Sequence, residues 1–193
     1  MKKLALALLA LPLAGCISFG AKPPPSLLSL TSREQIPPGQ QQSSASAKSI
    51  MIQVPSAPQA LATNRVPVHS GATEIAYVKD AVWVETPTRL FARLLADTVS
   101  ARAGRIVLSA TQSLADPGAR LMGELRSFGV DAGSSTAVVT YDAALVRQEG
   151  GPLEKRRFEA RVPVAAIEAA PVGVALNQAA NQVAEEVADW VGR

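Results

Sequence analysis

The sequence predicts an α+β domain: a mostly antiparallel β-sheet with two main helices packed on one face. Three observations support this. Three long segments in the second half of the chain alternate apolar and polar residues, and turns of hairpin length separate them. Two other segments repeat apolar residues at helical spacing. Helices that gather on one face of an antiparallel sheet define this fold class.

Residues 1–15 have the layout of a bacterial signal peptide. A basic start, Met1-Lys2-Lys3, precedes an apolar run from Leu4 to Leu13. At about 1.5 Å per residue, this run covers only about half of a ~30 Å hydrocarbon core. The segment therefore indicates a cleaved leader rather than a membrane span.

The single cysteine of the chain, Cys16, follows Leu13-Ala14-Gly15. This stretch resembles the lipobox of bacterial lipoproteins, in which cleavage between Gly15 and Cys16 frees a cysteine for lipidation. A thiolate is nucleophilic enough to take a diacylglyceryl group, and a further chain such as palmitate on the amine completes a durable anchor. A catalytic role is disfavoured because the only histidine, His69, is remote in sequence. We therefore expect Cys16 to be an anchor.

Residues 16–48 are expected to hold the lipidated cysteine and a tether of about thirty residues. Pro, Ser and Gln dominate this stretch, so it has little apolar area with which to form a core. The exception is Leu27, Leu28 and Leu30, which are expected to form a short strand on the domain. Ile17 and Ser18 follow the anchor where Asp would signal retention in the inner membrane, so an outer-membrane lipoprotein facing the periplasm is predicted.

Charge and composition exclude several classes of protein. The formal charge is only +3, and two of the basic residues, Lys2 and Lys3, lie in the leader. Nucleic-acid binding therefore has no support. A single cysteine permits no internal disulfide, so stability must come from the apolar core. The chain after the leader is long enough for one domain and a tail.

The folded domain is expected to span residues 49–193. Its first half contains short strands and one helix. Strands are expected from Ile50 to Val54, around Arg65-Val66 and from Ile75 to Val78, followed by a bend that carries Trp83. Thr86 and Pro87 are a capping hydroxyl and a proline at the first helical position. The helix that they begin presents one apolar face and ends at Gly104.

The second half contains the long strands and the last helix. A short strand at Ile106–Leu108 comes first. The expected long strands are Ala119–Val130, Thr136–Gln148 and a third in which Phe158, Ala160, Val162 and Val164 face inward while Arg157, Glu159 and Arg161 face outward. Gly133-Ser134-Ser135 and Gly150-Gly151-Pro152 are the turns between them, so the three strands should form an antiparallel meander. A final amphipathic helix is predicted from Val172 to Val191.

The order of these landmarks resembles the ABC-type transport auxiliary lipoproteins, which include the paraquat-inducible protein C-like group. The matching stretches after the lipobox are "IQVPSAPQALATNRV", "IAYVKDAVWVETPTRLFARLLADTV", "GARLMGELRSFGVD", "TYDAALVRQEGG" and "NQAANQVAEEVADWV". They span about residues 50–191. The chain departs from the family in one place, because Leu27-Leu28-Ser29-Leu30 stands where the family usually carries an aromatic pair.

The resemblance implies a non-catalytic envelope component. Its partners would be an ABC permease and ATPase and a protein of the mammalian-cell-entry (MCE) type, and its cargo class would be phospholipid moved between the inner and outer membranes. A homo-oligomer would match the symmetry of ring-shaped partners. The alternative is a structural or assembly lipoprotein that binds another envelope protein without a transport role.

Four residues are candidate contacts with a partner or a lipid. Trp83 and Tyr77 are aromatic side chains of the kind that anchor interfaces, although packing inside the fold is the simpler interpretation of both. Arg89 and Arg93 lie one helical turn apart and could meet anionic headgroups or an acidic partner, but a solvated helix face is the simpler interpretation.

No catalytic residue, metal site or cofactor is predicted. One histidine and a lipidated cysteine give no metal-ligand pattern, and the sequence holds no nucleophile elbow, phosphate-binding loop or dinucleotide fingerprint. Two mechanisms stay open. The domain could hold a lipid in an apolar pocket between sheet and helices, or it could act only as an adaptor that grips the transporter.

Overall fold

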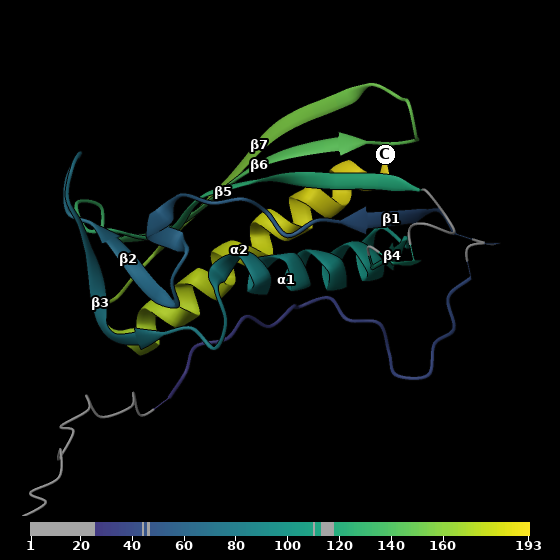
Figure 1. Cartoon of the computed structure of the whole chain (residues 1–193). Coiled ribbons are helices and arrows are strands. Elements are labelled where there is room, and N and C mark those ends of the chain that lie inside the picture. Colours follow the sequence, from purple (N-terminus) through teal and green to yellow (C-terminus); the bar gives the residue numbers. More distant parts are fainter. Residues whose placement is uncertain (1–25, 44, 46, 110, 113–117) are drawn as a thin grey trace, which may run out of the picture.

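The computed structural model describes residues 26–43, 45, 47–109, 111–112 and 118–193 (Figure 1). The predicted signal peptide, its cleavage site at Gly15 and the lipidation site Cys16 lie outside the described residues. The predictions for that part of the chain therefore stay predictions.

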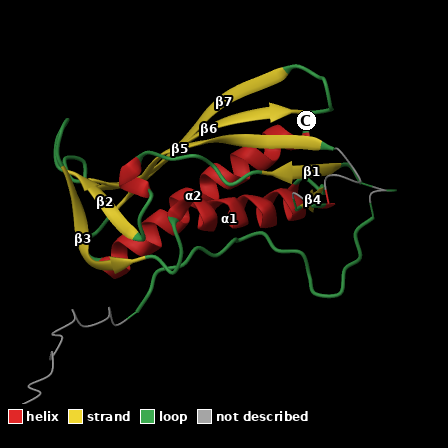
Figure 2. Cartoon of the chain, viewed as in Figure 1, coloured by secondary structure: helices red, strands yellow, loops and turns green. Residues whose placement is uncertain are grey.

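Seven strands form one sheet in the described part of the chain, and two α-helices accompany it (Figure 2). The strands are β1 (Ser49–Ile52), β2 (Arg65–His69), β3 (Ile75–Val82), β4 (Ile106–Leu108), β5 (Ala119–Asp131), β6 (Thr136–Val146) and β7 (Leu153–Pro163). The helices are α1 (Pro87–Arg102), α2 (Ala169–Gly192) and a short 3₁₀ turn, η1 (Gln59–Leu61).

The sheet is mixed, which corrects the prediction that it is mostly antiparallel. The predicted meander β5–β6–β7 is antiparallel throughout, and so is the pair β2–β3. However, β1 and β2 both run parallel to β5, and β4 runs parallel to β1. The period-two pattern of a strand fixes which face it buries but not the direction of its neighbour, so sequence periodicity could not detect these parallel pairs.

Both helices lie side by side on one face of the sheet, as predicted (Figure 1). Helix α1 begins at Pro87 as expected, but the Thr86 hydroxyl lies 3.2 Å from the Thr88 hydroxyl and makes no capping bond to the backbone. Helix α2 begins at Ala169, three residues before the predicted start, with Pro171 in its first turn. Proline is compatible with this position because the first helical N–H groups need no partner within the helix.

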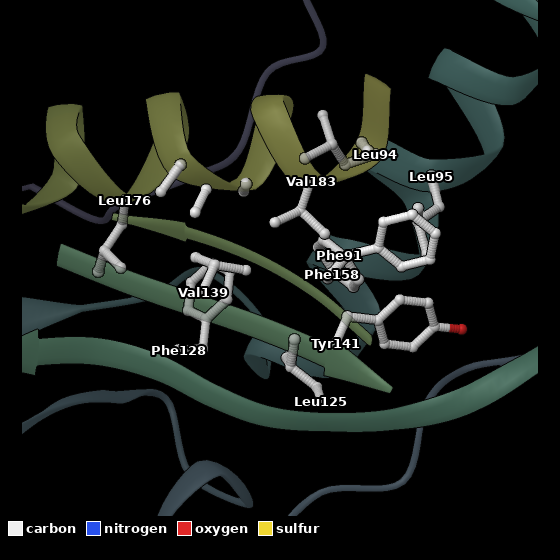
Figure 3. Packing of buried hydrophobic residues seen from close by; sticks show 14 of the residues in the cluster. Phe91, Leu94, Leu95, Leu125, Phe128, Val139, Tyr141, Phe158, Leu176 and Val183 are labelled. Atoms are coloured by element: carbon white, nitrogen blue, oxygen red, sulfur yellow. The ribbon is translucent and has the colours of Figure 1, made fainter. Parts of the chain in front are cut away.

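The space between the helices and the sheet is filled by side chains. Four aromatic rings from different elements meet edge to face. Between ring centres, Trp83 lies 5.5 Å from Phe128. Phe128 lies 6.4 Å from Phe91, and Phe91 lies 5.3 Å from Tyr141 (Figure 3). Such pairs add about 0.5–1.5 kcal/mol each beyond the burial of their area. They join the end of β3, α1, β5 and β6 into one core.

Two arginines bind the C-terminal end of α2. Arg105 donates a hydrogen bond of 2.9 Å to the carbonyl of Val191, and Arg147 donates to the carbonyls of Trp190 and Val191 at 3.2 and 3.3 Å. Burial, with a smaller contribution from Arg147, lowers the pKa of the Arg105 guanidinium. The last carbonyls of a helix lack partners within it, and cations there also favour the helix dipole. These contacts attach the end of α2 to β6 and to the entry of β4.

The N-terminal segment packs along the two helices (Figure 1). Leu28 pairs with Trp83 in an isolated bridge, so this leucine-rich stretch docks on the domain as predicted but does not form the predicted strand. Leu27 remains 53% exposed. Further along, the buried Asn181 donates to the carbonyl of Thr31 and accepts from the N–H of Arg33, both at 2.9 Å. These contacts remove residues 28–33 from the stretch expected to act as a tether.

Replacing Asn181 with alanine should release this segment. The substitution leaves the Thr31 carbonyl and the Arg33 N–H without their partner, which is expected to cost about 1–3 kcal/mol of unfolding free energy. Hydrogen exchange at residues 28–34 should accelerate more than exchange in β5 and β6. Gln178→Ala, on the same helix, is the matched control. Equal exchange in the two variants would contradict the assigned role of Asn181.

Tyr141→Phe should leave stability unchanged or raise it. The Tyr141 hydroxyl is buried and has no hydrogen-bond partner among the described residues (Figure 3), and its burial raises the pKa of the phenol. Removing a buried polar atom without a partner is expected to stabilise by up to about 1 kcal/mol, whereas Phe91→Ala at the neighbouring ring should cost about 3–5 kcal/mol. Urea unfolding measures both. A clear loss of stability in Tyr141→Phe would show that the hydroxyl has a partner.

Candidate partner-binding surface

The structure separates the four predicted contact residues. Trp83 is completely buried against Phe128, so its packing role is the one observed. The other three lie at the surface. The Tyr77 ring is stacked by the guanidinium of Arg65 at 4.1 Å, and Arg93 forms a 2.6 Å ion pair with Glu85 that raises the pKa of the arginine. Arg89 is exposed on α1, and no ion pair to another described residue is found for it. The four residues therefore do not form one site.

A different surface concentrates charged groups: the face of the β5–β6–β7 meander opposite the helices. Strand register arranges its side chains in rows across the three strands. One row contains Met122, Ala144 and Lys155, the next Glu124, Asp142 and Arg157, and a third Ser127, Thr140 and Glu159. We call this surface the open face. The alternation in β7 predicted its outer residues, but the rows depend on register, which the sequence does not reveal.

Asp142 is the centre of the ion pairs on the open face. The guanidinium of Arg157 on β7 donates two hydrogen bonds, of 2.6 and 2.7 Å, to its carboxylate. The guanidinium of Arg126 on β5 lies 3.9 Å from the same carboxylate. Arg126 also contacts Glu124 at 3.3 Å, so it lies between two carboxylates that stand directly opposite each other. The hydrogen bonds from Arg157 are the main cause of a lowered pKa at Asp142.

A second cluster lies nearer the turn between β5 and β6. Glu159 accepts hydrogen bonds of 2.8 Å from both Thr140 and Arg161, and these bonds lower its pKa. Arg161 also lies 3.8 Å from Asp131, whose pKa is lowered chiefly by the backbone N–H of Ser134. The open face is thus ordered by paired charges along its length.

The open face is hollowed by a shallow groove of about 720 Å³. Met122 and Ala144 supply apolar surface there, and Glu124, Lys155 and Arg157 supply the charges. A wide groove with charges of both signs is suited to another polypeptide, because it can match partner charges without enclosing a small ligand.

The described residues contain no arrangement that suggests a metal site. No group of three or more His, Cys, Asp or Glu side chains in this part of the chain is placed to hold an ion. His69 is exposed at the end of β2. Among the helices of the described residues, none has the length and apolar character needed to cross a bilayer.

The fold and surface define a class of protein: an α+β domain with a docked N-terminal segment and a charged open sheet face. The sequence model of the ABC-type transport auxiliary lipoprotein component matches residues 29–188. The chain therefore belongs to this family, as the resemblance in sequence predicted. Membership makes the protein an auxiliary component of ABC-type transport and an envelope lipoprotein.

Two crystal structures share the fold. One, from a Xanthomonas campestris protein of the family DUF330, is 22% identical and gives a TM-score of 0.68 over 86% of this chain and 94% of that one. The other, an uncharacterised protein, is 15% identical and gives a TM-score of 0.65 over 86% of this chain and 99% of that one. No curated protein matches the chain.

Asp142→Asn should make stability less dependent on pH in acid. The pKa of Asp142 is lower in the folded state than in the unfolded chain. The ionised carboxylate therefore adds to the free energy of unfolding at pH values above its pKa in the unfolded chain, and this stabilisation is lost as the pH falls through its pKa in the folded state. The variant should be slightly less stable than the parent at neutral pH, and the two should converge below about pH 4. Thermal unfolding across this range tests it. A difference that persists at low pH would exclude the ion pair as its cause.

Proposed function

We propose that this protein is a periplasm-facing auxiliary lipoprotein of an ABC/MCE-type lipid transport system. In this role it acts between the inner and outer membranes as a docking component and performs no catalysis. Its partners would be the MCE-domain protein and the ABC permease and ATPase complex, with phospholipid as the cargo class. Family membership over residues 29–188 carries the proposal, and the open face supplies the surface through which the domain would grip its partner.

An adaptor role is better supported than a carrier role. A domain that carried a lipid would need an apolar cavity large enough for acyl chains. Here, the interior between sheet and helices is occupied by the aromatic rings of Phe91, Phe128 and Tyr141 and by the aliphatic side chains around them (Figure 3). The roomy groove of about 720 Å³ lies instead on the open face, among charged side chains.

The experiment is purification of the full protein from its own envelope in mild detergent, with co-purifying proteins and lipids identified by mass spectrometry. Arg157→Glu places a like charge against Asp142 on the open face and should reduce partner recovery about tenfold. Arg89→Glu, the same change on the exposed face of α1, is the matched control and should leave recovery unchanged.

Each outcome separates the alternatives. Recovery of an MCE-type protein or an ABC permease supports the transport role, and stoichiometric phospholipid would favour a carrier over an adaptor. Recovery of a different envelope protein alone would favour a structural or assembly lipoprotein. Loss of the partner in Arg89→Glu but not in Arg157→Glu would move the docking surface to α1.

A further inference from the structure

The end of the domain where α2 begins is apolar. A groove of about 380 Å³ lies there between the end of β7 and the first turns of α2. Its lining includes Val162, Pro163, Ala165, Ala170, Pro171 and Val174. We call this groove, together with the neighbouring Ile167, the apolar end.

Large apolar side chains of the apolar end are in contact with solvent. Val174 is 70% exposed and Ile167 is 38% exposed. The helix behind them carries no charged residue from Ala169 to Ala184, and its charges begin only at Glu185. The two ends of α2 therefore differ: the C-terminal end bears several carboxylates and is bound by arginines, whereas the N-terminal end presents apolar groups beside the exposed Glu168 at its N-cap.

The N-terminal segment enters the fold at the same end. The side chain of Leu28 packs closely on Gly173: a Cβ atom added to this glycine would lie 2.7 Å from Cδ2 of the leucine. Gly173 directly precedes the exposed Val174. Leu27 and Val84, which flank the bridge between Leu28 and Trp83, are 53% and 45% exposed. The chain that leads back to Cys16 therefore begins beside the apolar end (Figure 1).

The length of that chain limits how far the apolar end can be from the membrane. Eleven residues separate Cys16 from Leu28. Whatever their conformation, they span at most about 40 Å, and a flexible chain of this length spans about 20 Å on average. Helix α2, with 24 residues, is about 36 Å long. An anchor on Cys16 therefore holds the N-terminal end of α2 within about 40 Å of the bilayer, and at about 20 Å for a flexible chain of average extension, while its charged end can lie a whole helix length further away.

We propose that the apolar end rests on the surface of the phospholipid bilayer that holds the Cys16 anchor. The contact is peripheral, with Val174 and Ile167 meeting the boundary between headgroups and acyl chains, where exposed apolar side chains bind membranes without crossing them. This arrangement orients the domain and leaves the groove of the open face, which lies toward the start of β7 and not at its end, available to a partner. It depends on the anchor but not on the identity of the transport system.

Because the native cysteine is the lipidated one, an introduced cysteine would be the single free thiol in the mature chain. The lipidated full-length variant Val174→Cys would be labelled with an environment-sensitive fluorophore and reconstituted in vesicles of phosphatidylethanolamine and phosphatidylglycerol. Leu153→Cys, at the start of β7, is the matched control, since Leu153 is also exposed, at 52%. Both sites are exposed, so both variants should fold, and unchanged melting temperatures would confirm this.

The probe at position 174 should shift to the blue and be quenched severalfold more by doxyl-labelled lipids than by aqueous iodide, whereas the probe at 153 should show the reverse. Iodide quenching of both probes would overturn the proposal. A blue shift at 174 without quenching by doxyl lipids would also overturn it, because it would indicate a second copy or another protein on this surface. Absence of acyl chains from the purified protein, measured by mass spectrometry, would remove its basis independently of any transport partner.

Discussion

The pairing of β5 along both of its edges is the constraint on which the rest of the structure depends. One edge pairs with β6 over the length of the strand, and the other accepts β1 at its first residues, Ala119–Leu121, and β2 at its end. Neighbouring backbones approach closely at two glycines. A Cβ on Gly123 would lie 2.2 Å from the carbonyl oxygen of Asp142, and one on Gly129 would lie 2.4 Å from that of Pro67. Larger residues at these positions would separate the strands.

The bulge in the pairing of β5 with β6 connects this framework to the open face. The register shifts between Leu125 and Ser127, and Arg126 lies at that point. Its guanidinium contacts both Glu124 and Asp142, so Arg126 and Arg157 together compensate two carboxylates that face each other across the strands. Like charges directly opposite each other destabilise a sheet, so the irregular register and the ordered charges are two aspects of one arrangement.

The N-terminal segment is held on both helices by polar and apolar contacts. Asn181 is buried and bonds to backbone groups on both sides of Ser32, so the segment is held by an inner polar contact as well as by its leucines. With the segment docked from Leu28 onward, eleven residues separate it from Cys16, so an anchor at this predicted site would restrict the orientation of the domain as well as its location. An adaptor benefits from such a restriction, because a partner then meets the open face in a narrow range of orientations.

The sequence by itself determined the local elements, the predicted anchor and the family. Alternation and helical periodicity located β5, β6, β7, α1 and α2 to within a few residues, because burial on one face imposes a period on each element separately. Only the tertiary structure decided the direction of β1 and β2, the burial of Trp83, the rows of the open face and the docking of residues 28–33. Each of these depends on contacts between segments far apart in the chain, such as Asp142 with Arg157 or Thr31 with Asn181. Periodicity within one segment carries no information about its neighbour.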